Sequence, residues 1–131
     1  MSADSVNNST GRWSNASPIG KFFSAIYLKP ELLEAANRVH TEAQKHGING
    51  HEVALRWVLH HSALKGELGD GMIVGASSVE QLDDNLKMCD AGPLPDDLLK
   101  VVEDVWPLAE PVAPYVSFAE PGSSVDIDNI C

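Results

Sequence analysis

One short apolar run constrains the fold of this chain more than any other feature. Residues 72–74, with the sequence Met-Ile-Val, form a continuous apolar stretch of the kind that buried strands contain. A run of small residues follows up to Ser78, and apolar positions then recur at helical spacing, at Leu82, Leu86 and Cys89. The pattern predicts a strand, a tight turn and a helix, an arrangement in which α/β proteins bind anions.

Helical spacing describes most of the remaining chain. Apolar residues mark one face between Glu31 and Gly47, where a glycine that follows basic residues favours the end of a helix. Further helices are predicted over residues 50–64, from near Val79 onward, and over residues 95–109, where a proline and two aspartates suit a helix start. We therefore expect an α/β chain that is mostly helical, with about four helices and one short strand.

The two ends of the chain differ from its middle. Residues 1–19 are polar and rich in Gly, Ser and Asn, whereas residues 111–131 contain several prolines and no regular pattern. We expect an N-terminal arm, a folded part over residues 20–110 and an irregular C-terminal tail. A lone strand in the folded part cannot satisfy its own backbone hydrogen bonds in a core. Either the strand prediction is wrong or the neighbouring strands lie outside this chain.

The charge balance of the chain excludes two classes of partner. The sequence has 9 basic and 19 acidic residues, and its formal net charge is −10. An extended nucleic-acid surface or an anionic membrane is therefore not an expected partner. The N-terminus lacks the apolar segment of a secretion signal, and no stretch approaches the roughly 20 apolar residues of a membrane span, so we expect a cytoplasmic protein.

Several motifs of metal sites and catalytic sites fail on inspection. His51 and Glu52 open a zinc-protease pattern, but the second histidine is missing at the required spacing. The sequence GASSV lacks the second glycine of a nucleophile elbow. His60 and His61 point about 100° apart on a helix, so they cannot act as an i, i+4 ligand pair. These motifs predict neither a metal site nor a catalytic nucleophile.

The turn before the helix near Val79 has a purely structural interpretation. Ser78 and Gln81 form a capping box, and Ser77 and Glu80 offer the same box one residue earlier. In such a box the side chains satisfy the backbone groups that a helix start leaves without partners. A helix start capped in this way needs no ligand.

The same turn also has a functional interpretation. The free amides of a helix start and the hydroxyls of Ser77 and Ser78 can hold a phosphate, which the helix dipole favours. Gly75 would let the backbone approach that phosphate closely. Asn85, about two turns along the helix, can reach the edge of a purine. The residues alone leave both interpretations open.

Residues 51–99 resemble a known family. The segment HEVALRWVLHHSALKGELGDGMIVGASSVEQLDDNLKMCDAGPLPDDLL is similar to the C-terminal region of the aldo-keto reductases, in particular the aflatoxin B1 aldehyde reductase-like branch common in fungi. In that family an ALRW helix precedes the eighth barrel strand, a G-x-S-S-x-E-Q-L-x-x-N turn and helix, GPL and a terminal helix. Residues 11–36 fit the part that leads from the substrate loop into the seventh barrel helix.

The resemblance implies the C-terminal fragment of a (β/α)8 TIM barrel from an NADPH-dependent oxidoreductase that reduces aldehydes or ketones. The family's catalytic Asp, Tyr, Lys and His come from earlier strands, so the resemblance assigns no catalytic residue and no metal ligand to this chain. It assigns six residues to the adenosine-phosphate end of the cofactor: Gly75, Ala76, Ser77, Ser78, Gln81 and Asn85.

Two functional interpretations follow from these patterns. In the first, the chain is a truncated aldo-keto reductase of a fungal secondary-metabolite pathway, inactive when isolated and able to associate through its unpaired strand edge. In the second, it is a non-catalytic remnant that binds a nucleotide or another protein. An upstream reading frame that encodes the catalytic tetrad would favour the first interpretation.

Overall fold

The computed structural model describes residues 18–114, which form helices joined by turns and irregular segments. The helices are α2 (Pro18–Tyr27), α3 (Pro30–Lys45), α4 (Gly50–His61), α5 (Val79–Asp90), α6 (Asp96–Asp104) and the short α7 (Trp106–Ala109). Two 3-10 turns complete the order, η1 (Gly66–Leu68) and η2 (Glu110–Val112). Within these residues no helix is both long enough and apolar enough to cross a membrane.

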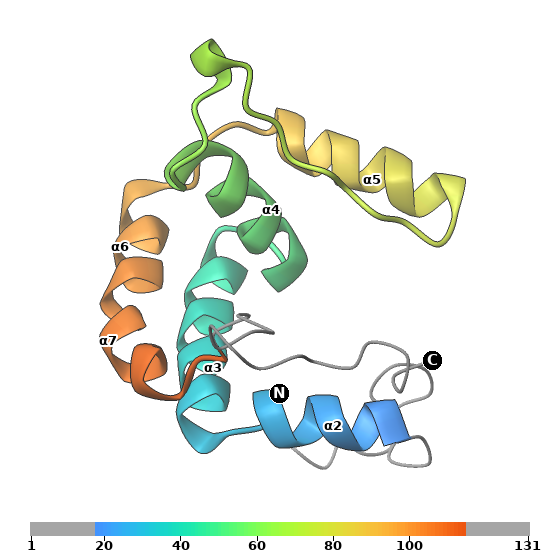
Figure 1. Ribbon diagram of the computed structural model, residues 1–131. Helices are drawn as coiled ribbons and strands as arrows, with labels where there is room; N and C mark the ends of the chain where they lie inside the picture. Colours follow the sequence, from blue (N-terminus) through green and yellow to red (C-terminus); the bar gives the residue numbers. More distant parts are fainter. Residues whose placement is uncertain (1–17, 115–131) are drawn as a thin grey trace.

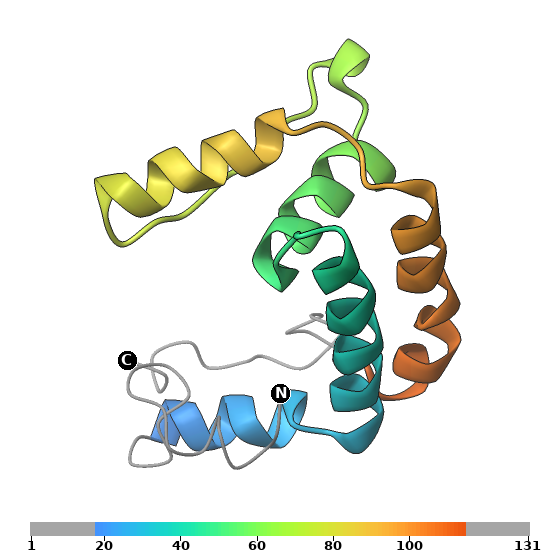
Figure 2. The ribbon, with the colours of Figure 1, turned by 180° about the vertical axis from the view of Figure 1, so that it is seen from behind.

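Three helices form a central cluster from which two others project (Figure 1). α3 packs against α4 and α6, and α7 continues the path of α6 along α3. α5 extends from the α4 end of this three-helix cluster and α2 from the opposite end. Both project to the same side of the cluster, as the reverse view also shows (Figure 2). The arrangement leaves α5 attached along one side only, to α4.

The core lies where α3, α4 and α6 meet. Its buried members come from these helices and from the loops beside them: Ala43, Ile48, Val53, Leu94 and Leu98. Four partly buried residues pack against this set, namely Val39, Trp57, Leu99 and Val102. Ala43 and Leu98 have no exposed surface. The end of α3 and the start of α6 are therefore held by the best-buried part of the molecule.

Caps and glycine conformation explain where the central helices begin and end. Pro30 occupies the first turn of α3, and Gly47, with a φ of +69°, follows its last turn. Asn49 caps α4, because its side chain accepts a hydrogen bond of 2.9 Å from the backbone N–H of Glu52. The four helices predicted from the sequence are confirmed as α3, α4, α5 and α6, but the last one, predicted over residues 95–109, ends at Asp104 and is followed by the separate α7.

The helix α2 is not among the elements predicted from the sequence. It begins at Pro18, inside the stretch expected to be a polar arm up to residue 19. Phe23 and Tyr27, four residues apart, stack on one another with ring centroids separated by 6.0 Å, which favours a helix here. Residues 1–17 of the expected arm and residues 115–131 of the expected tail lie outside the described residues.

The strand predicted at residues 72–74 is not formed in the described residues. Residues 70–76 have no regular secondary structure, and no strand occurs anywhere in residues 18–114. A strand exists through hydrogen bonds to a neighbouring strand, and the described part of the chain supplies no such neighbour. Ile73 is fully exposed in consequence. The apolar run that predicted burial is thus only partly covered, because Met72 and Val74 are half-buried.

Candidate functional site

The start of α5 is capped by the serine that the sequence predicted. Ser78 has extended backbone angles, and its hydroxyl accepts a hydrogen bond of 3.1 Å from the backbone N–H of Gln81. The return bond of the predicted capping box is shifted by one residue. The side-chain oxygen of Gln81 accepts from the backbone N–H of Ser77 at 2.7 Å and from its hydroxyl at 2.9 Å. The structural interpretation of this turn is therefore confirmed in its main bond.

The capped turn also presents the groups that an anion would need. Ser77, Ser78 and Gln81 are all exposed. The first amides of a helix lack hydrogen-bond partners inside the helix. Here the amide of Gln81 donates to the hydroxyl of Ser78. The amides of Val79 and Glu80 belong to the same end, where the helix dipole attracts negative charge. Backbone dipoles and hydroxyls, rather than charged side chains, make up this candidate site.

The charged side chains of α5 oppose an anion at this turn. Glu80, Asp83 and Asp84 follow within the first two turns of the helix. Lys87 lies next along this face but pairs with Asp84, at 3.1 Å between Nζ and Oδ1. The attraction of the helix start for a phosphate is therefore reduced by nearby carboxylates. We expect weak anion binding by this turn alone.

Asn85 is directed away from solvent and toward α4. Only 1% of its surface is exposed. Its Oδ1 lies 2.8 Å from Nε2 of His51, and its Nδ2 donates to the backbone carbonyl of Gly75 at 3.4 Å. With Nδ2 acting as donor, Nε2 of His51 carries the proton that Oδ1 accepts. The structure thus brings Asn85 to Gly75, but it uses both ends of the amide inside the protein.

The remaining predicted residues of the site, Gly75 and Ala76, are both exposed. A Cβ atom added at Gly75 would meet no atom within 4 Å. Neither crowding nor a left-handed backbone requires glycine here in this chain. The space beside Gly75 is open, as the close approach of a ligand would need.

Sequence patterns missed two side chains that hold the loop between α5 and α6. Arg56 is buried and donates to the carbonyls of Gly92 and Pro93, at 2.8 and 2.6 Å, and to Glu52 at 2.8 Å. Nε2 of His61 accepts from the backbone N–H of Leu94 at 3.0 Å. The i, i+4 spacing of Glu52 and Arg56 predicts their ion pair. No local pattern predicts the hydrogen bonds from Arg56 to the two loop carbonyls, which lie far away in the sequence.

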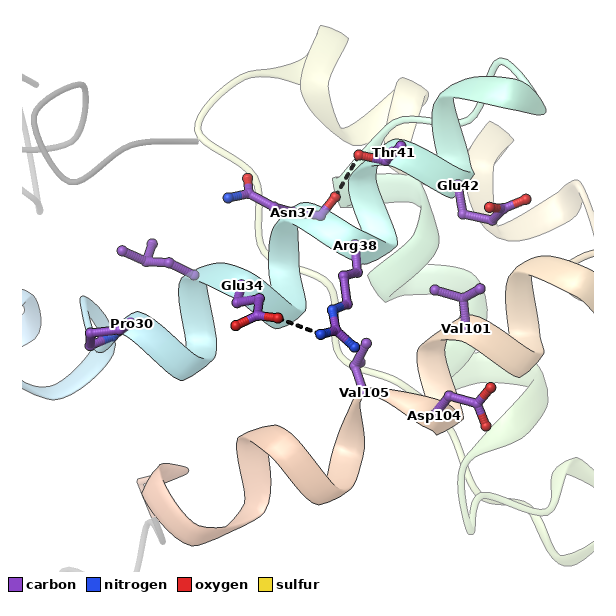
Figure 3. A pocket seen from close by; sticks show the side chains of 10 residues that line it. Pro30, Glu34, Asn37, Arg38, Thr41, Glu42, Val101, Asp104 and Val105 are labelled. Carbon is purple, nitrogen blue, oxygen red and sulfur yellow. Dashed lines mark hydrogen bonds and ion pairs between the residues drawn. The ribbon is translucent and has the colours of Figure 1, made fainter.

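One groove of the described residues lies away from the turn. It has a volume of about 850 Å³ and runs between α3 and α6 (Figure 3). Its polar groups are largely used within α3, since Arg38 pairs with Glu34, and Thr41 donates to the carbonyl of Asn37 at 2.9 Å. None of the six residues assigned to the cofactor lines this groove.

Comparisons with known proteins give this geometry a context. Residues 2–107 match the sequence model described as Aldo/keto reductase family. An oxidoreductase, sirO, of Leptosphaeria maculans is 43% identical over 109 residues, which cover 83% of this chain and 33% of that protein. An aldo-keto reductase of Pseudocercospora fijiensis is 41% identical over 95 residues, 72% of this chain and 32% of that protein.

A human relative matches a shorter part of the chain. The aflatoxin B1 aldehyde reductase member 4 of Homo sapiens is 46% identical over 86 residues, which cover 66% of this chain and 24% of that protein. The chain therefore spans about a third or less of the length of the curated relatives it matches.

Proposed function

This chain belongs to the aldo/keto reductase family, and on that premise we propose that its turn and the start of α5 hold the phosphate end of NADPH in a reductase of small aldehydes or ketones. The family fold is a (β/α)8 barrel, and the chain corresponds to its C-terminal part. The role of these residues is to bind and orient the cofactor, while NADPH supplies the hydride.

The observation that carries this proposal is the position of Ser77 and Ser78. Both are exposed and stand at the N-terminus of α5, where backbone amides and the helix dipole favour a phosphate. The family match includes this turn. Because the only charged side chains of the first turns are acidic, tight binding needs further groups from the rest of the barrel.

The uncovered apolar surface supports a place in a larger barrel. Ile73 is fully exposed, and Val79, Leu82 and Leu86, which we call the outer face of α5, are exposed by 76%, 39% and 50%. Globular proteins seldom leave contiguous apolar surface without a partner. We propose that residues 72–74 pair as a strand with other barrel strands and that the outer face of α5 packs against such a sheet.

The proposal places a condition on Asn85. Its side chain is buried and bonded to His51 and Gly75, so it can reach an adenine edge only by giving up the bond to His51. We therefore propose adenine contact by Asn85 in the assembled barrel, where new strands beside Gly75 change the packing of α5.

A second candidate is a non-catalytic module that binds a nucleotide or another protein. The same outer face of α5 favours it, because an exposed apolar helix face is a surface for a protein partner as well as for a sheet.

For the reductase we propose a cytoplasmic role in fungal secondary metabolism. The fungal source of the sirO relative supports the fungal part of this assignment.

The test is to co-express the chain with the part of the sirO relative that lies outside the matched region, and to titrate the purified complex with NADPH and NADH. We expect NADPH binding and aldehyde reduction by the complex. Replacing both Ser77 and Ser78 with Ala should weaken NADPH binding by about tenfold, since charge-assisted hydrogen bonds are lost.

Asn49→Ala is the matched control, because it removes an N-cap of the same kind from a different helix, α4. It should leave NADPH affinity unchanged. A stable complex that binds no NADPH would overturn the reductase proposal and favour the non-catalytic module. An equal loss of affinity in Asn49→Ala would refute the assignment of the turn.

A further inference from the structure

Three potential metal ligands meet where α3 ends and α6 begins. Glu42 and His46 stand four residues apart at the end of α3, and Asp97 comes from the first turn of α6. One ligand atom of each side chain lies within 4.8 Å of the others. Nε2 of His46 and Oδ2 of Asp97 are 3.2 Å apart. From this cluster we infer that the chain binds a divalent transition-metal ion of the zinc type, which joins α3 to α6.

The backbone positions of these ligands are fixed by the core. Glu42 is followed by Ala43, and Asp97 is followed by Leu98. Ala43 and Leu98 have no exposed surface and belong to the same buried cluster. The two ligand-bearing segments, far apart in sequence, are therefore held side by side by packing. Metal binding needs only side-chain rotation and no movement of either helix.

The observed spacing suits tetrahedral coordination. Zinc bonds to imidazole nitrogen and carboxylate oxygen are about 2.0–2.2 Å long, so ligand atoms in a tetrahedral site lie about 3.4 Å apart. The separation of 3.2 Å between His46 and Asp97 is close to this value. Glu42, on the same face of the helix as His46, would supply the third ligand, and water would take the fourth position.

The donor set favours zinc-type ions over magnesium or calcium. Imidazole suits zinc, copper and nickel, whereas magnesium and calcium prefer sites made of oxygen ligands. Oδ1 of Asp97 accepts a hydrogen bond of 3.0 Å from the backbone N–H of Leu98, which orients the carboxylate and leaves Oδ2 directed at His46.

One cation competes for this site. Nζ of Lys45 lies 2.6 Å from Oε2 of Glu42. The side chain of Lys45 is 64% exposed, so it can turn into solvent when a metal ion binds. Exposed ion pairs contribute little to stability, and the displacement therefore costs little. Removal of Lys45 should therefore strengthen metal binding.

The experiment is calorimetric titration of the tag-free chain with Zn²⁺, together with thermal unfolding with and without the ion. We expect one Zn²⁺ per chain and a higher melting temperature, because the ion binds the folded state only. His46→Ala and Asp97→Asn should each weaken Zn²⁺ binding by about tenfold or more. Lys45→Met should strengthen it, and Mg²⁺ should not compete.

His40→Ala is the matched control, since His40 is an exposed histidine of the same helix and lies outside the cluster. It should leave Zn²⁺ affinity unchanged, and circular dichroism of each variant checks that the helices persist. Unchanged Zn²⁺ affinity in folded His46→Ala, or an equal loss in His40→Ala, would overturn the proposal. With Co²⁺ in place of Zn²⁺, the visible absorption of a tetrahedral site should appear in the wild type and vanish in Asp97→Asn.

Discussion

Asn85 on α5 is hydrogen-bonded through Oδ1 to Nε2 of His51 on α4, at 2.8 Å. The two residues lie at an interface where Asn85 has almost no exposed surface. Its second bond, to the carbonyl of Gly75, extends the contact to the segment before the turn. This one amide therefore connects α4, α5 and the segment that leads to the candidate cofactor site.

Removal of the Asn85 side chain should destabilise the chain. Asn85→Ala leaves a buried gap and removes the partner of His51, so we expect the free energy of unfolding to fall by about 2 kcal/mol. His51→Ala, at the more exposed partner, should cost less. Urea denaturation of both single variants and the double variant gives the coupling, expected to be about 1 kcal/mol. Strictly additive effects would show that the bond does not contribute.

The cap of α5 should be measurable without any cofactor. Ser78→Ala removes the hydroxyl that accepts from Gln81, and we expect a loss on the order of 1 kcal/mol in unfolding free energy. Asn49→Ala, which removes the equivalent cap of α4, should cost a similar amount. An unchanged melting curve for Ser78→Ala beside a lowered one for Asn49→Ala would contradict the cap at α5.

Arg56 should be far more sensitive to replacement than an exposed arginine. Arg56→Met leaves Glu52 and two loop carbonyls without their donor in a buried setting, and we expect a loss of about 3 kcal/mol. Arg38→Met, which breaks an exposed ion pair with Glu34, should cost less than about 1 kcal/mol. Denaturation midpoints for the two variants check the difference. Equal losses of unfolding free energy in the two variants would show that the buried hydrogen bonds of Arg56 stabilise the chain no more than an exposed ion pair does.

The outer face of α5 should influence association more than stability. Replacing Leu82 and Leu86 with Gln should change the unfolding free energy by less than about 0.5 kcal/mol, because both side chains are exposed. Self-association at high protein concentration should decrease, since the substitutions remove apolar surface. Sedimentation velocity measures the effect, with Asp83→Asn as the control on the same helix. If the double variant does not fold, the outer face of α5 makes stabilising contacts inside the chain, and this prediction is wrong.

The isolated chain should not oxidise NADPH in the presence of a reactive aromatic aldehyde. Hydride transfer requires the nicotinamide to be held against the carbonyl beside a proton donor. The residues that we propose for the cofactor site in this chain would hold the other end of NADPH, not the nicotinamide. Absorbance at the NADPH band measures turnover. Activity that persists in homogeneous protein and falls in Asn85→Ala would refute this expectation.

Local patterns predicted four of the helices, but the strand that they predicted at residues 72–74 is absent from the described residues. The caps of α4 and α5, and the proline and glycine at the ends of α3, act within a few residues, so the sequence contains their signals. Residues 72–74 have a strand pattern, yet a strand depends on a partner that is distant in sequence. The same difference explains why the apolar run was read as buried although Ile73 is exposed.

The candidate site shows the same division between local and distant contacts. Ser77, Ser78 and Gln81 interact within five residues, and the bond from Gln81 to Ser78 was predicted, whereas the two bonds from Ser77 to Gln81 were not. The bond from Asn85 to His51 joins two helices, and no spacing rule connects them. The meeting of His46 with Asp97 was missed for this reason as well.

The hydrogen bonds of Arg56 and His61 hold together the two ends of a long excursion of the chain, residues 62–91. Residues 62–91 leave the three-helix cluster after α4 and return to it at Gly92, Pro93 and Leu94, which these two side chains hold. The entropy of closing such a loop grows only slowly with its length. The length of the excursion therefore adds little to the free-energy cost of closing it. A linker in place of the excursion would instead lose the contacts between α5 and α4, including the bond from Asn85 to His51.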